Sequence, residues 1–318
     1  MATGEPAETL AGVGEFGVIE RMVAGREQPA AVVLGPGDDA AVVAAADGNT
    51  VVSTDMLVQD RHFRLDWSTP HDVGRKAIAQ NAADMEAMGA RATAFVVAFG
   101  APADTAISQA VELTDGLWHE ARLLGAGIVG GDLVSAPQWV VSVTVLGDLA
   151  GREAVRRSGA RVGDTVAVIG ELGRSAAGYA LWDSGIRQFD ILRRRHLVPE
   201  PPYGQGRAAA DAGASAMTDV SDGLMADLGH IAATSGVGID VSTAGLSADR
   251  EAVAEAASVV GADAWAWVLG GGEDHALVAT FPGPLPTGWR AIGRVVDGPA
   301  AVSVDGDTWH GNPGWQSF

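Results

Sequence analysis

The chain has 318 residues, of which 47% are hydrophobic, so it is long enough for two domains with a core each. Forty acidic residues face 21 Lys and Arg, and the net charge of −19 disfavours nonspecific nucleic-acid binding, which depends on cationic side chains. The absence of cysteine excludes disulfides, thiolate zinc sites and a cysteine nucleophile.

The first half of the chain alternates β-rich runs with amphipathic segments. Thr69, Pro70 and Asp72 provide an N-cap, a first-turn proline and an acid at the third position, and they predict a helix from about Pro70 to Met88 that Gly89 closes. The other expected elements are strands at 31–34, 40–44, 50–58, 92–99, around 128 and at 139–146, and a helix at about 107–124. Residues 147–157 form the expected crossover, so we predict domains at residues 1–149 and 150–318.

The second half begins with an expected strand at Thr165–Ile169, followed by the turn GELGRSAAG, which opens a helix through Trp182. A strand, a tight turn and a helix N-terminus together predict a phosphate cradle. Further helices are expected at 205–212 and 223–234, and further strands at 216–218 and near residues 239, 277 and 302.

Six short acidic clusters, each next to glycine or a small hydroxyl residue, stand out: GPGDDAAVV, VVSTDMLV, NAADMEAMGA, IVGGDLV, MTDVSDGL and LGGGEDHALV. A carboxylate beside glycine lets a hard cation and a polyphosphate approach the backbone closely. The pattern therefore predicts an enzyme that handles ATP through several Mg²⁺ ions. A Walker-type ATPase is excluded, because the only lysine, Lys76, follows arginine rather than a P-loop glycine.

Four of these clusters also have a purely structural interpretation. Asp38 and Asp39 suit a turn, the Gly270–His275 run suits a flexible hairpin, and Ser221 or Asp222 suits a helix cap. Gly130, Gly131 and Asp132 end the expected strand GAGIV, where either a ligand or a hairpin turn is expected.

Asp84 gives a stronger indication than the other acids. It lies on the apolar stripe of its predicted helix, off the rows that would pair it with Arg75 or Lys76, which favours a buried carboxylate that binds a metal.

The ordered set GEFGVI, GPGDDAAV, STDMLVQDRHF, NAADMEAMGA, GGDL, RSGARVGD, SDGLMADLGH and GGEDH resembles the thiamine-monophosphate kinase family, which belongs to the superfamily of aminoimidazole ribonucleotide synthetase. The resemblance implies a two-domain α+β fold of mixed α/β type. Its N-terminal domain, a sheet with helices, binds ATP and Mg²⁺ and dimerises, and its α/β C-terminal domain completes the nucleotide and substrate site. The implied reaction is ATP-dependent phosphorylation of thiamine monophosphate to thiamine diphosphate, assisted by several Mg²⁺ ions, with dependence on K⁺ left open.

The resemblance also implies roles for individual residues. The metal ligands it implies are Asp39, Ser53, Thr54, Asp55, Asp84, Asp132, Asp219 and Asp222. Gly131, Asp132, Arg157 and Ser221 correspond to nucleotide contacts, and His62, Glu273 and Trp315 to residues that hold the thiamine moiety. Asp55, Asp132 and Arg157 are the expected catalytic residues.

The chemistry suits these residues. The acceptor, a phosphate monoester, is already ionised at neutral pH, so the reaction needs alignment and charge neutralisation rather than a general base. Arg157 would offset charge on the transferred group, and Trp315 and Glu273 suit a cationic thiazolium and an aminopyrimidine.

Two alternatives remain open on the sequence. One is another ATP-dependent synthetase of the superfamily, although the HF pair at 62–63 and Trp315 favour thiamine phosphate. The other is a non-catalytic protein that binds divalent metal, although such a protein would have its acids in one contiguous loop. No apolar stretch reaches the roughly 18 residues of a membrane span and no secretion signal opens the sequence, so we expect a cytoplasmic protein without membrane or nucleic-acid partners.

Overall fold

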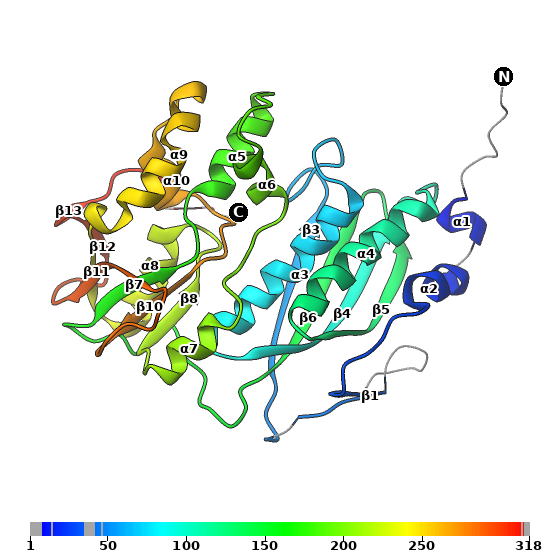
Figure 1. Cartoon of the computed structure of the whole chain (residues 1–318), viewed down its shortest axis with the longest axis horizontal. Coiled ribbons are helices and arrows are strands. Elements are labelled where there is room, and N and C mark those ends of the chain that lie inside the picture. The colour runs from blue at the N-terminus through cyan, green and yellow to red at the C-terminus, as the bar shows by residue number, and fades with distance from the viewer. Residues whose placement is uncertain (1–7, 14, 35–41, 46, 313, 315–318) are drawn as a thin grey trace. The chain divides into compact units, whose positions relative to one another are not determined.

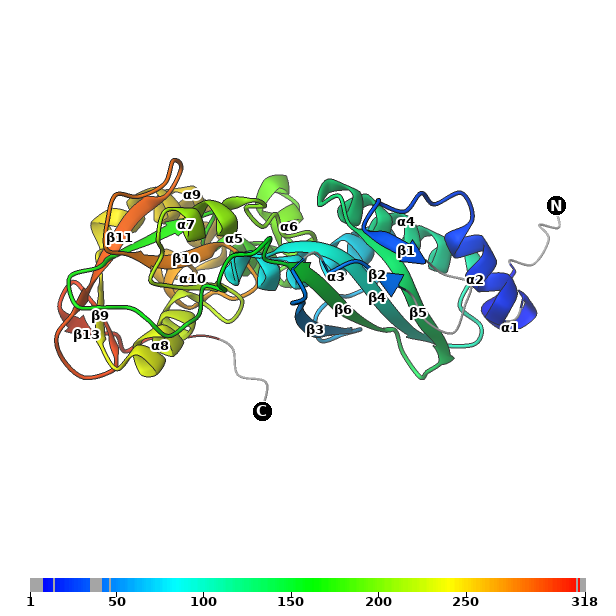
Figure 2. The ribbon, with the colours of Figure 1, turned by 90° about the horizontal axis from the view of Figure 1, so that it is seen from below.

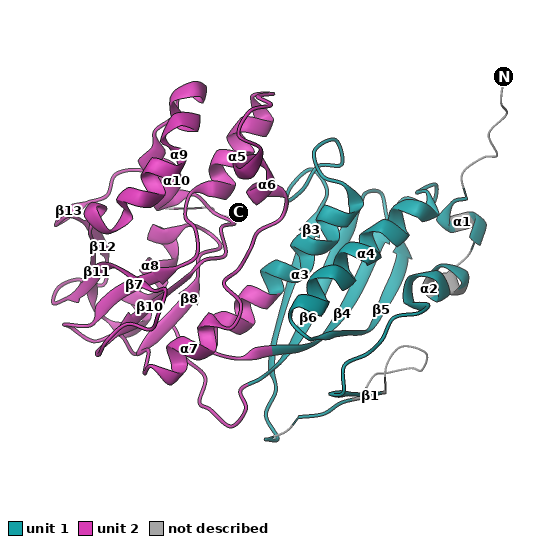
Figure 3. Ribbon diagram, viewed as in Figure 1, with its two compact units in different colours: residues 1–81, 92–148 teal, residues 82–91, 149–318 magenta. Residues whose placement is uncertain are grey.

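The computed structural model describes residues 8–13, 15–34, 42–45, 47–312 and 314. It divides into two compact units, one with residues 1–81 and 92–148 and the other with residues 82–91 and 149–318 (Figure 3). Helix α3, Pro70–Ala87, belongs in part to each unit.

The first unit is built on a four-stranded sheet in the order β3-β6-β4-β5. Strand β3 (Val51–Val58) pairs antiparallel with β6 (Val140–Asp148), and β4 (Arg91–Ala101) pairs parallel with β5 (Gly127–Ser135). Helices α3 and α4 (Ile107–Leu123) cover one face of this sheet (Figures 1 and 2). The shorter elements of this unit are α1 (Leu10–Val13), α2 (Glu15–Val23), β1 (Val32–Leu34) and β2 (Val42–Val43).

The start of α3 follows the sequence prediction closely. The backbone N–H of Asp72 donates to Thr69 Oγ1 at 3.1 Å, and the backbone N–H of Thr69 donates to Asp72 Oδ2 at 3.2 Å. This reciprocal pair satisfies two N–H groups that a helix N-terminus leaves without partners in the helix. At the other end Gly89 has φ +70°, a conformation that glycine adopts without strain, and the predicted helix is confirmed to within one residue.

Helices α3 and α4 approach each other through two glycines. A Cβ atom on Gly74 would lie 2.2 Å from the carbonyl oxygen of Leu113, and one on Gly116 would lie 2.0 Å from that of His71. Neither position has room for a side chain, so the absence of Cβ sets the distance between the two helices that cover the sheet.

The other face of this sheet carries exposed apolar side chains. Along β3, Val52 and Met56 are 58% and 52% exposed, whereas Leu57 is 1% exposed. This alternation is the period of two that a strand imposes on its side chains. Val96 of β4 and Val134 of β5 are exposed as well.

The expectation that the strand before Gly130 ends there is wrong. Strand β5 runs through Gly130, Gly131 and Asp132 to Ser135, and it stays paired with β4 throughout, with Gly131 opposite Val97 and Asp132 opposite Ala98. The two strands are so close that a Cβ on Gly131 would lie 2.0 Å from the carbonyl oxygen of Val97. Gly131 therefore allows the close packing of the two strands, and both glycines lie within the strand rather than in a turn.

The second unit contains a seven-stranded sheet in the order β13-β12-β9-β11-β7-β10-β8. Its strands are β7 (Thr165–Ile169), β8 (Ala216–Asp219), β9 (Gly238–Val241), β10 (Leu277–Phe281), β11 (Arg290–Val296), β12 (Val302–Val304) and β13 (Asp307–Thr308). Both faces are covered. Val166 and Val168 of β7 contribute to a large core cluster with Leu224 and Val253, whereas Ala167 between them joins a smaller cluster with Phe281.

The helices of this unit are α5 (Arg174–Asp183), α6 (Asp190–Leu197), α7 (Gln205–Asp211), α8 (Leu224–Ser235), a 3₁₀ turn at Thr243–Leu246, α9 (Ser247–Val260) and α10 (Ala264–Gly270). Helices α5, α7 and α8 and strands β7 to β10 lie where the sequence predicts them. Strand β12 matches the strand expected near residue 302, whereas helices α6, α9 and α10 and strands β11 and β13 had no counterpart in the prediction. No helix among the described residues is both long and apolar enough to cross a membrane.

Candidate functional site

Ser53, Thr54 and Asp55 lie within β3, an edge strand, rather than in a loop. Thr54 Oγ1 donates to the carbonyl oxygen of Val143 at 3.0 Å and accepts from Thr144 Oγ1 at 3.1 Å. Asp55 is paired with Val143 and is partly buried. The edge position explains how a strand accommodates three polar residues in a row, because water can reach them.

His62 follows β3 in a turn that two hydrogen bonds fix. Its Nδ1 accepts the backbone N–H of Val58 at 3.0 Å, and its carbonyl oxygen accepts a hydrogen bond from Lys76 Nζ at 2.8 Å. Lys76, 2% exposed, comes from helix α3. Because Nδ1 is an acceptor here, the neutral imidazole carries its proton on Nε2.

Gly131 and Asp132 lie on β5, at the opposite edge of the same sheet. Two strands, β6 and β4, separate Asp132 from Asp55, which corresponds to roughly 14 Å at the usual spacing of neighbouring strands. Asp132 also lies opposite the exposed Ala98, whereas Asp55 lies opposite the buried Val143. A single copy of this sheet therefore leaves these two predicted ligands apart.

A cavity of about 100 Å³ adjoins Gly131 and Asp132. Met22 and Val23 of α2 and Leu117 and Trp118 of α4 contribute to its mainly apolar wall.

Asp84 is half-buried, less than its place on the apolar stripe of α3 predicted. The basic residues nearest to it along the helix bind other groups. Arg75 forms an ion pair with Glu120 at 2.7 Å, and Lys76 donates to the carbonyl oxygen of His62.

In the second unit the two glycine-rich acidic clusters, 219–223 and 270–275, lie side by side. Strands β8 and β10 are antiparallel with Asp219 opposite Leu277, and the pairing continues past their ends, since the backbone N–H of Glu273 donates to the carbonyl oxygen of Ser221 at 2.7 Å. The two segments touch through glycine, because a Cβ on Gly272 would lie 2.7 Å from that same oxygen. The predicted close backbone approach is thus an approach to the other cluster.

Side-chain contacts also hold the 270–275 segment against the 219–223 segment. His275 Nδ1 lies 3.1 Å from Asp219 Oδ2, and both residues are buried. Glu273 and His275 have φ values of +62° and +52°, which non-glycine residues rarely adopt. A flexible hairpin does not fit these contacts, because strained backbone persists only where its surroundings fix it.

Asp274 occupies the predicted phosphate cradle at the start of α5. Its carboxylate accepts the backbone N–H groups of Gly173 and Ser175, the latter at 2.9 Å. Burial raises the pKa of Asp274 to about 7, although these two hydrogen bonds oppose the shift. The N–H groups proposed to hold a phosphate are therefore engaged by the protein itself.

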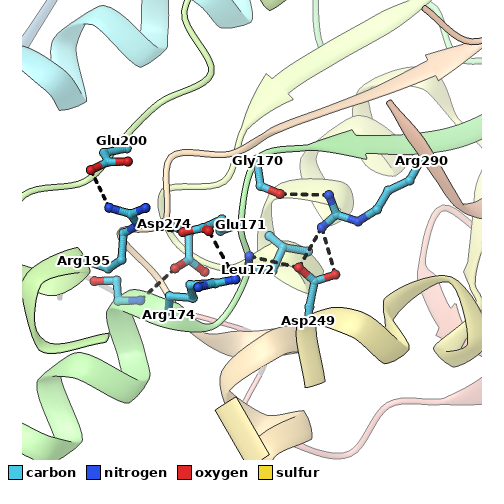
Figure 4. Close-up of polar contacts among 10 residues, drawn as sticks. Gly170, Glu171, Leu172, Arg174, Arg195, Glu200, Asp249, Asp274 and Arg290 are labelled. Carbon is cyan, nitrogen blue, oxygen red and sulfur yellow. Dashed lines mark hydrogen bonds and ion pairs between the residues drawn. The ribbon is translucent and has the colours of Figure 1, made fainter. Parts of the chain in front are cut away.

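Ion pairs surround the turn between β7 and α5 (Figure 4). Arg195 binds Glu171 at 2.7 Å and also pairs with Glu200. Arg290 binds Asp249 at 2.7 Å and donates to the carbonyl oxygen of Gly170 at 2.8 Å.

Neither Ser221 nor Asp222 caps helix α8. The N-cap is Gly223, without a side-chain cap, and Asp227 from within the helix accepts the backbone N–H groups of Asp222 and Gly223, both at 3.1 Å. Burial raises the pKa of Asp227 to about 7, and the charges of Asp219 and Asp222 add to this.

The ligand atoms of Asp222, Asp227 and His230 lie within 4.8 Å of one another. Burial raises the pKa of Asp222, although His230 lowers it. Asp227 and His230 were not among the predicted ligands, although the i, i+3 spacing in DLGH could have indicated them.

Arg157 lies beside β8. Its Nε donates to Thr218 Oγ1 at 3.3 Å, and the carbonyl oxygen of the preceding Arg156 accepts the backbone N–H of Met217 at 3.0 Å. The second unit thus gathers Arg157 with Asp219, Ser221, Asp222 and Glu273 around the end of β8.

Two predicted residues, Asp39 and Trp315, lie outside the described residues. Gly314, which precedes Trp315, is described and approaches the 219–223 segment, since a Cβ on it would lie 2.5 Å from the carbonyl oxygen of Asp222.

Two family models match the chain. The N-terminal domain of AIR synthase related proteins matches residues 37–149, and the C-terminal domain of the same proteins matches residues 161–304. The fold, a mixture of sheets and helices, is therefore that of the AIR synthase related class, as the sequence predicts.

Similar proteins show which family within the AIR synthase related class this chain resembles. A thiamine-monophosphate kinase of Mycobacterium tuberculosis strain H37Rv is 70% identical over 318 residues, which cover 100% of this chain and 95% of the relative. The crystal structure of thiamine-monophosphate kinase from Stenotrophomonas maltophilia K279a has a TM-score of 0.78 at 31% identity and covers 92% of this chain and 95% of its own. AaThiL complexed with AMPPCP and TMP has a TM-score of 0.76 at 29% identity, with coverage of 99% and 100%. The chain belongs to the thiamine-monophosphate kinase family, which confirms the resemblance seen in the motifs.

Proposed function

We propose that the protein transfers a phosphoryl group from ATP to thiamine monophosphate and forms thiamine diphosphate. The main support is the 70% identity, over the whole chain, to a relative with that name. The complex of AaThiL with AMPPCP and TMP supports it further, because that protein binds a nucleotide analogue together with TMP.

The donor set suits Mg²⁺ rather than a softer metal. Ser53, Thr54, Asp55 and Asp132 in the first unit and Asp84, Asp219 and Asp222 in the second offer hydroxyl and carboxylate oxygens, which hard cations prefer. Asp39, outside the described residues, belongs to the same proposed set. Several Mg²⁺ ions bound there would neutralise the charge of the two phosphate-bearing substrates.

The chain's own residues would align the reactants for in-line transfer. The acceptor oxygen of a phosphate monoester is ionised at neutral pH, so no residue has to remove a proton from it. Arg157, held beside β8 by Thr218, would offset charge on the transferred group. Ser221 lies in the segment next to it and is the proposed partner of Arg157 in nucleotide binding.

For the other substrate we assign the thiamine moiety to His62, Glu273 and Trp315. Glu273 is only partly exposed, with 33% of its side chain accessible, and a carboxylate there suits the cationic thiazolium or the aminopyrimidine. The hydrogen bond from the backbone N–H of Val58 to Nδ1 would set the orientation of the His62 ring in this site.

We further propose that the protein is a homodimer and that the open face of the first sheet is its interface. Val52, Met56, Val96 and Val134 together form an exposed apolar surface, which is typical of protein contacts. A second copy is the favoured occupant, because Asp55 and Asp132 lie on opposite edges of the sheet and a partner's edge strand can supply the missing acid.

The N-terminal domain, residues 1–149, would then bind ATP and dimerise, and residues 150–318 would complete the nucleotide and substrate sites. Because ATP is the donor, we place the reaction in the cytoplasm.

A product assay tests the proposed activity. Purified protein with Mg-ATP and thiamine monophosphate, with and without K⁺, is expected to yield thiamine diphosphate and ADP in equal amounts, and EDTA is expected to stop the reaction. Aminoimidazole ribonucleotides and simple phosphate monoesters serve as competing acceptors in the same assay. ATP consumption without thiamine diphosphate would reject the proposed function.

A further inference from the structure

His196 lies against Glu273, and neither the motifs nor the family resemblance gives it a role. It belongs to helix α6, which the sequence did not predict, and its Nδ1 lies 3.5 Å from Glu273 Oε2. The His196 side chain is 9% exposed, so this contact is largely sheltered from water, where an imidazole N–H to carboxylate interaction is stronger than at the surface.

Helix α5 fixes the position of His196. Ser175 Oγ lies 3.2 Å from His196 Nδ1, and the Tyr179 ring meets the imidazole edge to face with centroids 5.4 Å apart. Ser175 and Tyr179 are one turn apart, so both flank the same histidine. Between them Gly178 lets α6 approach, because a Cβ there would lie 2.2 Å from the carbonyl oxygen of Leu192 and 2.9 Å from His196 Cβ.

The same part of α5 also holds the backbone that carries Glu273. The backbone N–H of Ser175 donates to Asp274, while His275 contacts Asp219 and the N–H of Glu273 donates to Ser221. The main chain on both sides of Glu273 is thus fixed, but its long side chain has several rotamers. Contact with His196 restricts those rotamers.

We propose that His196 is a positioning residue for the substrate: through its Nδ1 it holds the Glu273 carboxylate where the thiamine moiety binds, and Ser175 orients the imidazole. The inference rests on the proposed function, since it assigns a supporting residue to the thiamine end of that site. This role requires the His196 tautomer with its proton on Nδ1, because this N–H then points to both Glu273 Oε2 and Ser175 Oγ.

Substitutions at His196 separate this role from a packing role. His196→Asn keeps an N–H donor near the position of Nδ1, whereas His196→Gln places its amide farther out, near Nε2, and His196→Leu has no donor. With thiamine monophosphate varied at saturating Mg-ATP, we expect His196→Leu and His196→Gln to raise KM for thiamine monophosphate roughly tenfold, because the polar contact that orients the Glu273 carboxylate is lost. The Asn variant should stay within about threefold of wild type, and kcat and the KM for ATP should change little in all three.

His119→Leu is the matched control, because His119 is an exposed histidine on α4 in the other unit and has no proposed role in the site. Calorimetric titration with thiamine monophosphate should give the same order of affinities as KM. Equal KM values for the Asn and Gln variants would overturn the proposal, and this comparison still holds if the Leu variant does not fold. An unchanged KM in all variants, with wild type making thiamine diphosphate, rejects the role of His196 alone, whereas a wild type that makes none rejects the proposed function.

Discussion

At the scale of single residues, several charged or ligating side chains hold other side chains or the backbone in place. Asp274 binds the N-terminus of α5, Lys76 holds the turn of His62, and His275 contacts Asp219. The sequence motifs locate these residues but do not say which of them faces a ligand. GGGEDH predicted a close backbone approach, and the structure places Glu273 toward His196 while Asp274 points inward to α5.

The partly buried Asp274 should make the stability of the protein depend on pH. Its pKa is about 7 in the folded chain against 3.8 for an unperturbed group, so the folded state binds the proton more tightly than the unfolded state. The stability it contributes is fully present below about pH 4 and is lost as the pH rises through 7, by at most about 4 kcal/mol. We expect Asp274→Asn to reduce the fall in unfolding free energy between pH 4 and pH 8, measured by urea denaturation at several pH values.

The pH slope should become smaller in that variant rather than vanish, because the pKa of Asp227 is also raised to about 7 and acts in the same direction. Wild-type and Asn proteins with parallel pH profiles would contradict the assignment to Asp274.

At the scale of elements, local signals predicted what local chemistry determines. The reciprocal pair of Thr69 and Asp72 and the positive φ of Gly89 act within one helix, so α3 was predicted to within one residue. The end of β5 was not predicted correctly. Two adjacent glycines, Gly130 and Gly131, are typical of a turn, and the sequence does not show that β4 approaches Gly131 at Val97. Helix α6 was missed because the run RRRHLVPEPPY is basic and rich in proline. In the folded chain Arg195 forms an ion pair with Glu171, and Arg193 stacks on the ring of Trp182.

The crossing of α3 and α4 should be sensitive to one methyl group. We expect Gly116→Ala to destabilise the protein by roughly 1–3 kcal/mol, because its Cβ would overlap the carbonyl oxygen of His71 and force the helices apart. Gly229→Ala in α8 is the matched control. A Cβ at Gly229 meets no atom within 4 Å, so that change should stabilise the helix by up to about 1 kcal/mol. Urea midpoints that move in the same direction for both variants would be inconsistent with a tight helix crossing.

At the scale of the whole molecule, the sheet of the first unit keeps two of the predicted metal ligands apart. The motifs predicted which acids matter but not their separation, because the order of strands in a sheet depends on long-range pairing that the sequence pattern does not encode. Asp55 and Asp132 proved to lie on strands β3 and β5, the two edges of the sheet. The exposed apolar face of this sheet, with Met56 and Val96, is the proposed binding surface for a second copy.

Mixing two inactive variants tests whether a site takes Asp55 from one chain and Asp132 from the other. Asp55→Asn and Asp132→Asn should each lower kcat by about 100-fold or more when assayed alone, because each removes a proposed metal ligand. In a dimer of one chain of each kind, one site would carry both substitutions and the other would keep both acids. A refolded equal mixture should therefore recover roughly a quarter of wild-type activity, since half of the dimers are mixed and each has one intact site of two. Differently tagged copies of Asp55→Asn alone are the control and should stay inactive. A mixture as inactive as its components would mean that both acids of a site come from one chain, and the roughly 14 Å across the sheet would then have to be bridged by substrate and metals within that chain.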